Sequence, residues 1–133
     1  MIRSESFPTD SPEYRLMEFL HAWKKGKYKT MATHCQKTWL SDRTDPANAL
    51  NIMFSHVTLE TAEILDVEDF KGIKVEALGI DKGDVICDIL ISVKVNGIFQ
   101  IRKPRIMRES EAYEPDVEGD WGVNPISMLR KIK

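Results

Sequence analysis

The segment from Val85 to Arg108 limits the possible fold more than any other part of the chain. Every second residue in its first half is apolar, which is the period of a strand with one face on a core. Asn96-Gly97 then reverses the chain, and a second apolar run follows. The alternating positions are Val85, Cys87, Ile89, Ile91, Val93 and Val95. We therefore expect one long β-hairpin that the rest of the chain covers.

The turn of this hairpin can be built in two ways. A two-residue Asn96-Gly97 turn would place Val93 opposite Gln100, so that an apolar and a polar side chain share one face of the sheet. A three-residue loop with a left-handed glycine would instead pair Val93 with Phe99. We expect the three-residue loop, because it keeps apolar side chains together.

The return arm of the hairpin becomes basic around Pro104. A proline cannot donate a hydrogen bond to a neighbouring strand, so Pro104 indicates an edge or a bulge. The basic residues are Arg102, Lys103, Arg105 and Arg108. We interpret them as a solvated strand end that also protects an edge from aggregation. An anion-binding site is the alternative.

Helical patterns fill the first third of the chain. Pro12 follows two possible capping residues, Asp10 and Ser11, and an apolar face extends from there to Gly26. Apolar residues then recur at helical spacing over residues 28–39, which predicts a second helix after a bend or break at the glycine. A third, short helix begins at Asp45-Pro46 and ends near residue 54.

Strands fill most of the remaining chain. Residues 58–70 and 73–80 each predict one strand, and residues 81–84 a turn into the hairpin. Residues 109–120 are acidic with a proline and a glycine, which is typical of a surface loop, and a last strand surrounds Trp121. These elements predict an α+β fold, with N-terminal helices packed on a curved antiparallel sheet of four to five strands.

Composition is typical of one soluble domain. The chain has 133 residues, of which 42% are hydrophobic and 30% charged. We expect residues 1–10 to form a flexible arm and residues 11–133 a single domain. No apolar run approaches the roughly 20 residues that span a bilayer, and no secretion signal is present, so we expect a cytoplasmic protein. The net charge of −2 argues against nucleic acid or a membrane as partner.

The order of elements resembles the nuclear transport factor 2-like superfamily, also described as cystatin-like. The resemblance is carried by the segment EFLHAWKKGKYKTMATHCQKTW and by the late GDWGVNP, and it covers most of the chain. Within these segments the residues are Phe19, Leu20, Trp23, Gly26, Tyr28, Trp39, Trp121 and Pro125. The resemblance implies a cavity between the helices and the concave face of the sheet, and frequently a homodimer through the other face.

No catalytic motif accompanies this architecture. His21 and His34 have no second ligand at a metal-binding spacing, and Cys35 and Cys87 predict two buried thiols rather than a zinc or redox site. We therefore expect no catalytic residue, no metal and no cofactor. A protein of this kind would bind a small apolar molecule or a protein partner.

Aromatic residues are the candidates for lining the cavity, although at helical spacing they also fit a plain core. The candidates are Phe19, Trp23, Tyr28, Trp39, Phe99 and Trp121. The alternative function is a small isomerase or lyase of the ketosteroid-isomerase or polyketide-cyclase kind. It would need a buried acid or histidine facing Tyr14 or Tyr28 across the cavity.

Overall fold

The structure, a computed structural model, describes residues 7–75 and 79–130. Helices occupy the first part of the chain and its end, and strands occupy the middle. The helices are α1 (Pro12–Lys25), α2 (Tyr28–Thr33), α3 (Lys37–Ser41), α4 (Pro46–Phe54), the 3-10 helix η1 (Lys82–Asp84) and α5 (Pro125–Leu129). The strands are β1 (Leu59–Val67), β2 (Lys74–Val75), β3 (Ile80–Asp81), β4 (Ile86–Val95), β5 (Ile98–Arg102), β6 (Arg105–Glu111), β7 (Glu114–Pro115) and β8 (Asp120–Val123).

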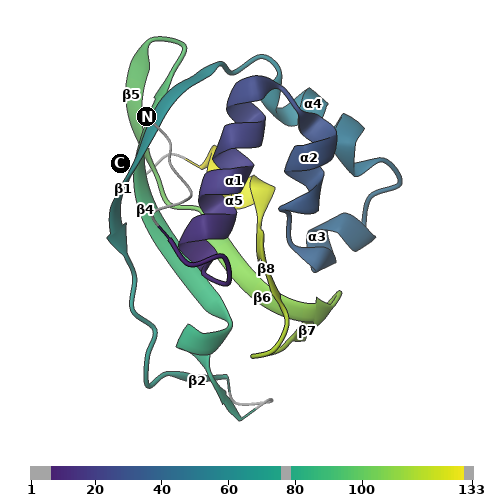
Figure 1. Cartoon of the computed structure of the whole chain (residues 1–133), viewed down its shortest axis with the longest axis vertical. Helices are drawn as coiled ribbons and strands as arrows, with labels where there is room; N and C mark the ends of the chain where they lie inside the picture. The colour runs from purple at the N-terminus through teal and green to yellow at the C-terminus, as the bar shows by residue number, and fades with distance from the viewer. Residues whose placement is uncertain (1–6, 76–78, 131–133) are drawn as a thin grey trace.

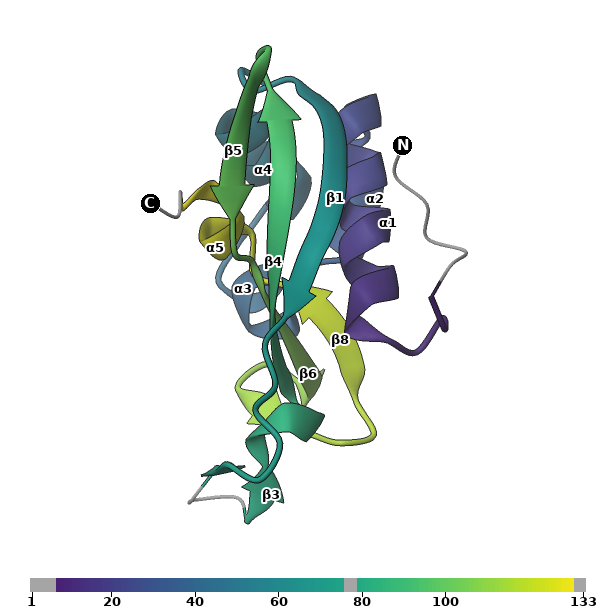
Figure 2. The ribbon, with the colours of Figure 1, turned by 90° about the vertical axis from the view of Figure 1, so that its left-hand side faces the viewer.

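Six of these strands form one open antiparallel sheet. Its path runs β1-β4-β6-β7, with β5 also paired to β4 and β8 also paired to β6. Helices α1 to α4 lie on one face, whereas none of the helices in the described part of the chain covers the face turned toward the viewer in Figure 2 (Figures 1 and 2). The predicted α+β class with helices on one face of an antiparallel sheet is confirmed, although the sheet has six strands instead of four to five.

The starts of α1 and α4 follow from their capping residues. The Ser11 hydroxyl accepts a hydrogen bond from the backbone N–H of Tyr14, and the Asp45 carboxylate accepts one from Asn48 at 3.1 Å. Gly26 ends α1 in a left-handed conformation (φ 68°), which glycine adopts without steric cost. These three boundaries confirm the sequence-based prediction.

The predicted helix over residues 28–39 is wrong, because the chain breaks between α2 and α3. At the break, the backbone N–H of Val123 donates to the carbonyl of His34 at 2.8 Å, and the N–H of Gln36 donates back to Val123 at 2.9 Å. Pairing with β8 therefore replaces the helical hydrogen bonds of this segment. No local sequence pattern could indicate a pairing partner that lies almost ninety residues away in the chain.

The hairpin between β4 and β5 has the two-residue turn, so the expected three-residue loop is wrong. Asn96 (φ 49°) and Gly97 (φ 81°) are both left-handed, as a type I′ turn requires. Val93 consequently lies opposite Gln100, and Phe99 lies on the face away from the helices, with 69% of its surface exposed. This tight turn matches the twist of the two strands that it joins. That advantage outweighs the cost of placing polar and apolar side chains opposite each other across the hairpin.

Pro104, predicted at an edge or a bulge, lies at a break between β5 and β6, and the basic residues around it are not a solvated strand end. Arg102 is 4% exposed and donates to the carbonyl of Met128 at 2.7 Å. Arg105 forms a two-pronged ion pair with Asp88, at 2.8 and 3.0 Å. The other two cations pair in the same way, Lys103 with Glu68 and Arg108 with Asp10. This arm therefore ties together the end of the sheet, α5 and the N-terminal segment.

Two further strand predictions are corrected. Residues 73–80 do not form one strand, because β2 and β3 pair with each other as a short hairpin, of which residues 76–78 lie outside the described chain. Residues 109–120 are not simply a surface loop, since β6 continues to Glu111 and the side chain of Glu109 is 2% exposed. The strand predicted over residues 58–70 is confirmed as β1, which however ends at Val67 and does not include residues 68–70.

The core lies between the sheet and the helices and draws side chains from α1 to β8. Both cysteines are buried and free, as expected. At the N-terminus, Phe7 packs against this core, whereas residues 1–6 of the expected flexible arm lie outside the described chain. Within the described ranges, none of the helices has the length and apolar character that crossing a membrane requires.

Candidate functional site

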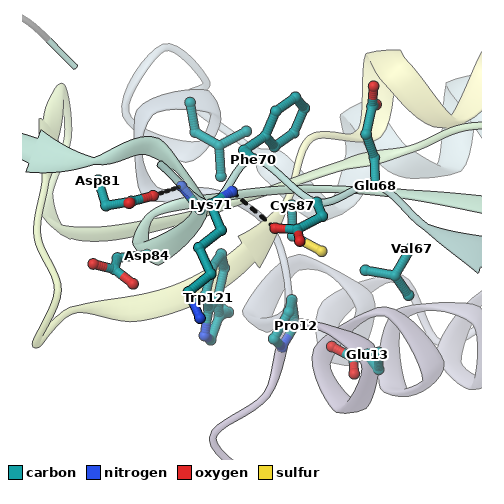
Figure 3. Close-up of a pocket in the computed structure, with 13 residues that line it drawn as sticks. Pro12, Glu13, Val67, Glu68, Phe70, Lys71, Asp81, Asp84, Cys87 and Trp121 are labelled. Atoms are coloured by element: carbon teal, nitrogen blue, oxygen red, sulfur yellow. Dashed lines mark hydrogen bonds between the residues drawn. The ribbon is translucent and has the colours of Figure 1, made fainter. Parts of the chain in front are cut away.

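A pocket of about 610 Å³ lies at one end of the sheet, within the usual range of about 300–1,000 Å³ for small-molecule sites. Its walls come from the first turn of α1, the start of β4, β8, and the segment of residues 67–84, described at 67–75 and 79–84, that leaves the sheet and returns to it (Figure 3). The apolar part of the lining consists of Pro12, Val67, Phe70, Ile86 and Trp121.

Asp81 holds the 67–84 segment in its folded-back shape. Its carboxylate accepts hydrogen bonds from the backbone N–H groups of Gly72 at 2.7 Å and Gly83 at 2.9 Å. These two hydrogen bonds lower the pKa of Asp81 below its ordinary value, because they stabilise the charged form. On the same segment, the Lys82 ammonium lies 4.1 Å from the centre of the Phe70 ring. One wall of the pocket therefore depends on a single structural carboxylate.

Cys87 contributes a neutral thiol to the pocket. Burial, followed by the nearby charges of Glu13 and Asp88, raises the pKa of this thiol to about 12. A thiolate is the reactive form of cysteine, so Cys87 does not provide a nucleophile at neutral pH. Its role in the lining is that of a small apolar group.

Carboxylates outnumber cations among the side chains that line the pocket. Glu68 pairs with Lys103, Asp69 accepts from the backbone N–H of Lys71, and Asp81 is used as described above. Glu13 and Asp84 differ from these three, because neither has a hydrogen bond or an ion pair within residues 7–75 and 79–130. The pocket thus combines apolar walls with two uncommitted carboxylates.

Of the six predicted cavity-lining residues, the structure places only Trp121 in this pocket. Phe19 and Trp23 are core residues that pack edge-on against Phe54, with ring centres 5.9 and 4.9 Å apart. Trp39 is also buried, under the guanidinium of Arg43. Tyr28 packs against the core from the edge of α2.

Among the six residues predicted to line the cavity, Phe99 departs most from the prediction, because it is exposed on the opposite face of the sheet. Conversely, sequence reasoning missed Glu13, Phe70 and Cys87 as pocket residues. Pro12-Glu13 was visible only as a helix start, and Phe70 only as the end of a strand. Their meeting depends on the fold of the 67–84 segment, which carries no local motif.

The histidines and tyrosines lie outside this pocket. The Arg15 guanidinium is 2.8 Å from Nδ1 of His34, and burial lowers the pKa of that imidazole. No group of His, Cys, Asp and Glu side chains in the described ranges has an arrangement suited to a metal ion. Apart from the protonated Cys87 thiol, the titratable side chains of the described lining are therefore carboxylates and the ammonium of Lys71.

Fold and pocket together define a small α+β protein with an apolar, carboxylate-bearing pocket at the end of its sheet. No protein-family model, no curated protein sequence and no solved structure matches this chain. The function must accordingly be argued from the pocket and the surface themselves.

Proposed function

We propose that this chain is a non-catalytic, cytoplasmic domain of the nuclear transport factor 2-like kind that binds a small, largely apolar molecule in the pocket beside Trp121. The observation that carries the proposal is a cavity of ligand size between α1 and the sheet, with Val67, Phe70 and Trp121 in its walls. Apolar walls around a concave site favour occupancy by an apolar body. Two buried free thiols agree with a reducing compartment.

An isomerase or lyase is the competing function, and the lining of the pocket favours binding over catalysis. Such an enzyme needs an acid and a base in contact with the same ligand, usually with pKa values set apart by their surroundings. The described lining contains neither histidine nor tyrosine, and its thiol stays protonated. The remaining groups are carboxylates and the Lys71 ammonium, and within the described lining no ion pair or side-chain hydrogen bond joins that ammonium to a carboxylate as an acid–base pair.

Binding is tested with a neutral apolar fluorophore such as N-phenyl-1-naphthylamine. We expect one fluorophore to bind per chain, and we expect Val67→Trp to abolish binding because the indole fills the pocket. Leu65→Trp is the matched control, since Leu65 is an exposed residue of the same strand that does not line the pocket. Equal binding by both variants would remove the pocket as the site.

The open face of the sheet supports a further part of the proposal, a homodimer. Register places Leu90, Phe99 and Ile101 on this face, away from the helices. A two-fold axis parallel to β4 would place these apolar side chains of one copy against those of the other.

Two adjacent residues of β5 provide the test of this dimer. Phe99 and Ile98 are similarly exposed, at 69% and 62%, but they point to opposite faces of the hairpin. We expect Phe99→Asp to convert a dimer to a monomer in analytical ultracentrifugation, whereas Ile98→Asp leaves the dimer intact. A wild-type protein that stays monomeric at every concentration would exclude the interface.

A further inference from the structure

We infer that the molecule bound in the pocket carries a positively charged group, an ammonium, which pairs with Glu13 while its apolar body contacts Phe70 and Trp121. This inference rests on the proposed binding function and adds the chemical class of the ligand. It follows from the balance of charges in the lining and from the place of one carboxylate within it.

Carboxylates outnumber ammonium groups in the described lining, although one of them, Glu68, pairs with Lys103. Glu13, Glu68, Asp69, Asp81 and Asp84 contribute carboxylates, and Lys71 contributes the single ammonium group among the described lining residues. Concave sites lined by one sign of charge concentrate ligands of the opposite sign. An anionic ligand would therefore be disfavoured here, and a cation would be attracted.

Glu13 differs from the other carboxylates because of where it lies. It is half-buried in the first turn of α1, directly before the core residues of that helix, and within the described chain it has no hydrogen bond or ion pair. Its charge also reaches the Cys87 thiol in the pocket, whose pKa it helps to raise. In Figure 3, Glu13 projects from α1 on one side of the pocket, and Asp84 lies on another.

The three remaining carboxylates already have partners inside the protein. Asp81 and Asp69 accept backbone hydrogen bonds of the 67–84 segment, and Glu68 pairs with Lys103 at 2.7 Å. Asp84 is exposed and can contribute only through solvent. Glu13 is therefore the carboxylate that can exchange water for a ligand cation without breaking a contact of the fold.

The aromatic walls suit the same ligand class. Phe70 and Trp121 each have a cation of the chain near the ring, Lys82 at 4.1 Å and Arg108 at 5.6 Å from the ring centres. Because these cations already lie near the rings, Phe70 and Trp121 offer apolar surface to the body of the ligand, and its ammonium group is left to Glu13. A ligand with an ammonium group and a compact hydrocarbon body would thus find both of its parts matched.

Three rigid probes with one hydrocarbon body test the inference: 1-adamantylamine, 1-adamantanol and 1-adamantanecarboxylate. At neutral pH they are cationic, neutral and anionic. We expect the amine to displace the neutral fluorophore with about fivefold higher affinity than the alcohol, and the carboxylate to bind most weakly. In Glu13→Gln, we expect the amine to lose this advantage while the affinity of the alcohol stays unchanged.

Glu63→Gln is the matched control, because it removes the same charge from the opposite face of the sheet. It should leave the order of the three probes as in the wild type. Equal affinities for amine and alcohol, or an advantage that survives in Glu13→Gln, would overturn the inference and leave the apolar pocket standing. If neither the fluorophore nor any probe bound, the proposed binding function itself would fail.

Discussion

The buried carboxylate of Glu109 on β6 holds the start of α3 from across the fold. It accepts a hydrogen bond from the backbone N–H of Thr38 at 3.1 Å and another from the Thr38 hydroxyl. The side-chain amide of Gln36 adds a third contact at 3.4 Å. A helix of five residues has little stability of its own, so this contact between distant segments fixes α3 on the sheet.

Glu109→Gln should destabilise the protein by about 1–3 kcal/mol, because the new amide presents N–H donors to the donors of Thr38 and Gln36. The free energy of unfolding in urea measures the effect. Glu118→Gln is the control, since Glu118 is exposed on a loop. A Glu109→Gln variant as stable as the control would mean that the buried carboxylate does not stabilise the helix.

Gly122→Ala should cost at least about 2 kcal/mol of stability, because a β-carbon there would lie 2.6 Å from the carbonyl oxygen of Cys35 and from Cα of Gln36. Both contacts are to backbone, so no side-chain rotation relieves them. Gly97→Ala is the comparison. It has open space but a left-handed backbone, and it should cost about 1–2 kcal/mol. Unfolding titrations of both variants measure the two losses of stability. A larger loss for Gly97→Ala than for Gly122→Ala would contradict the close approach of β8 to the α2–α3 break.

His34 should make the protein less stable as pH falls below the ordinary histidine pKa of 6.5. Burial and then the charge of Arg15 lower the pKa of His34 in the folded state, although Glu18 opposes them. The unfolded chain therefore takes up the proton first, and stability is lost as pH falls from 6.5 toward the lower folded pKa. Above pH 6.5 the stability that neutral His34 contributes is fully present.

His34→Asn tests this pH dependence, because asparagine keeps an acceptor for Arg15 but does not titrate. The stability difference between wild type and variant, measured by urea unfolding from about pH 7.5 to 5.5, should change with pH. A constant difference for His34→Asn would show that His34 does not couple to folding.

Cys35 and Cys87 should resist alkylation in the folded protein. Burial raises the pKa of both thiols, that of Cys87 to about 12, so that almost no thiolate exists at neutral pH. We expect iodoacetamide to label neither cysteine in native buffer and both in denaturant, as read by mass spectrometry. Rapid native labelling of Cys87 would indicate a reactive group in the pocket and would favour catalysis.

Local patterns were sufficient for features that depend on neighbouring residues. Ser11-Pro12 and Asp45-Pro46 marked helix starts because capping is a contact within four residues. Alternation from Val85 to Val95 marked the central strand. Pro104 indicated an edge or a bulge because it lacks an N–H, and the structure interrupts the return arm there.

Tertiary structure decided every feature that depends on segments far apart in the chain. The break between α2 and α3 follows from backbone pairing with Val123. Glu109 is buried where its carboxylate accepts the backbone hydrogen bond of Thr38. The pocket arises where the 67–84 segment returns to the first turn of α1, so its residues share no periodicity that a sequence could display. Aromatic spacing predicted Phe19 and Trp23 as lining, but the same spacing fits a core equally well, and only packing against Phe54 distinguishes the two.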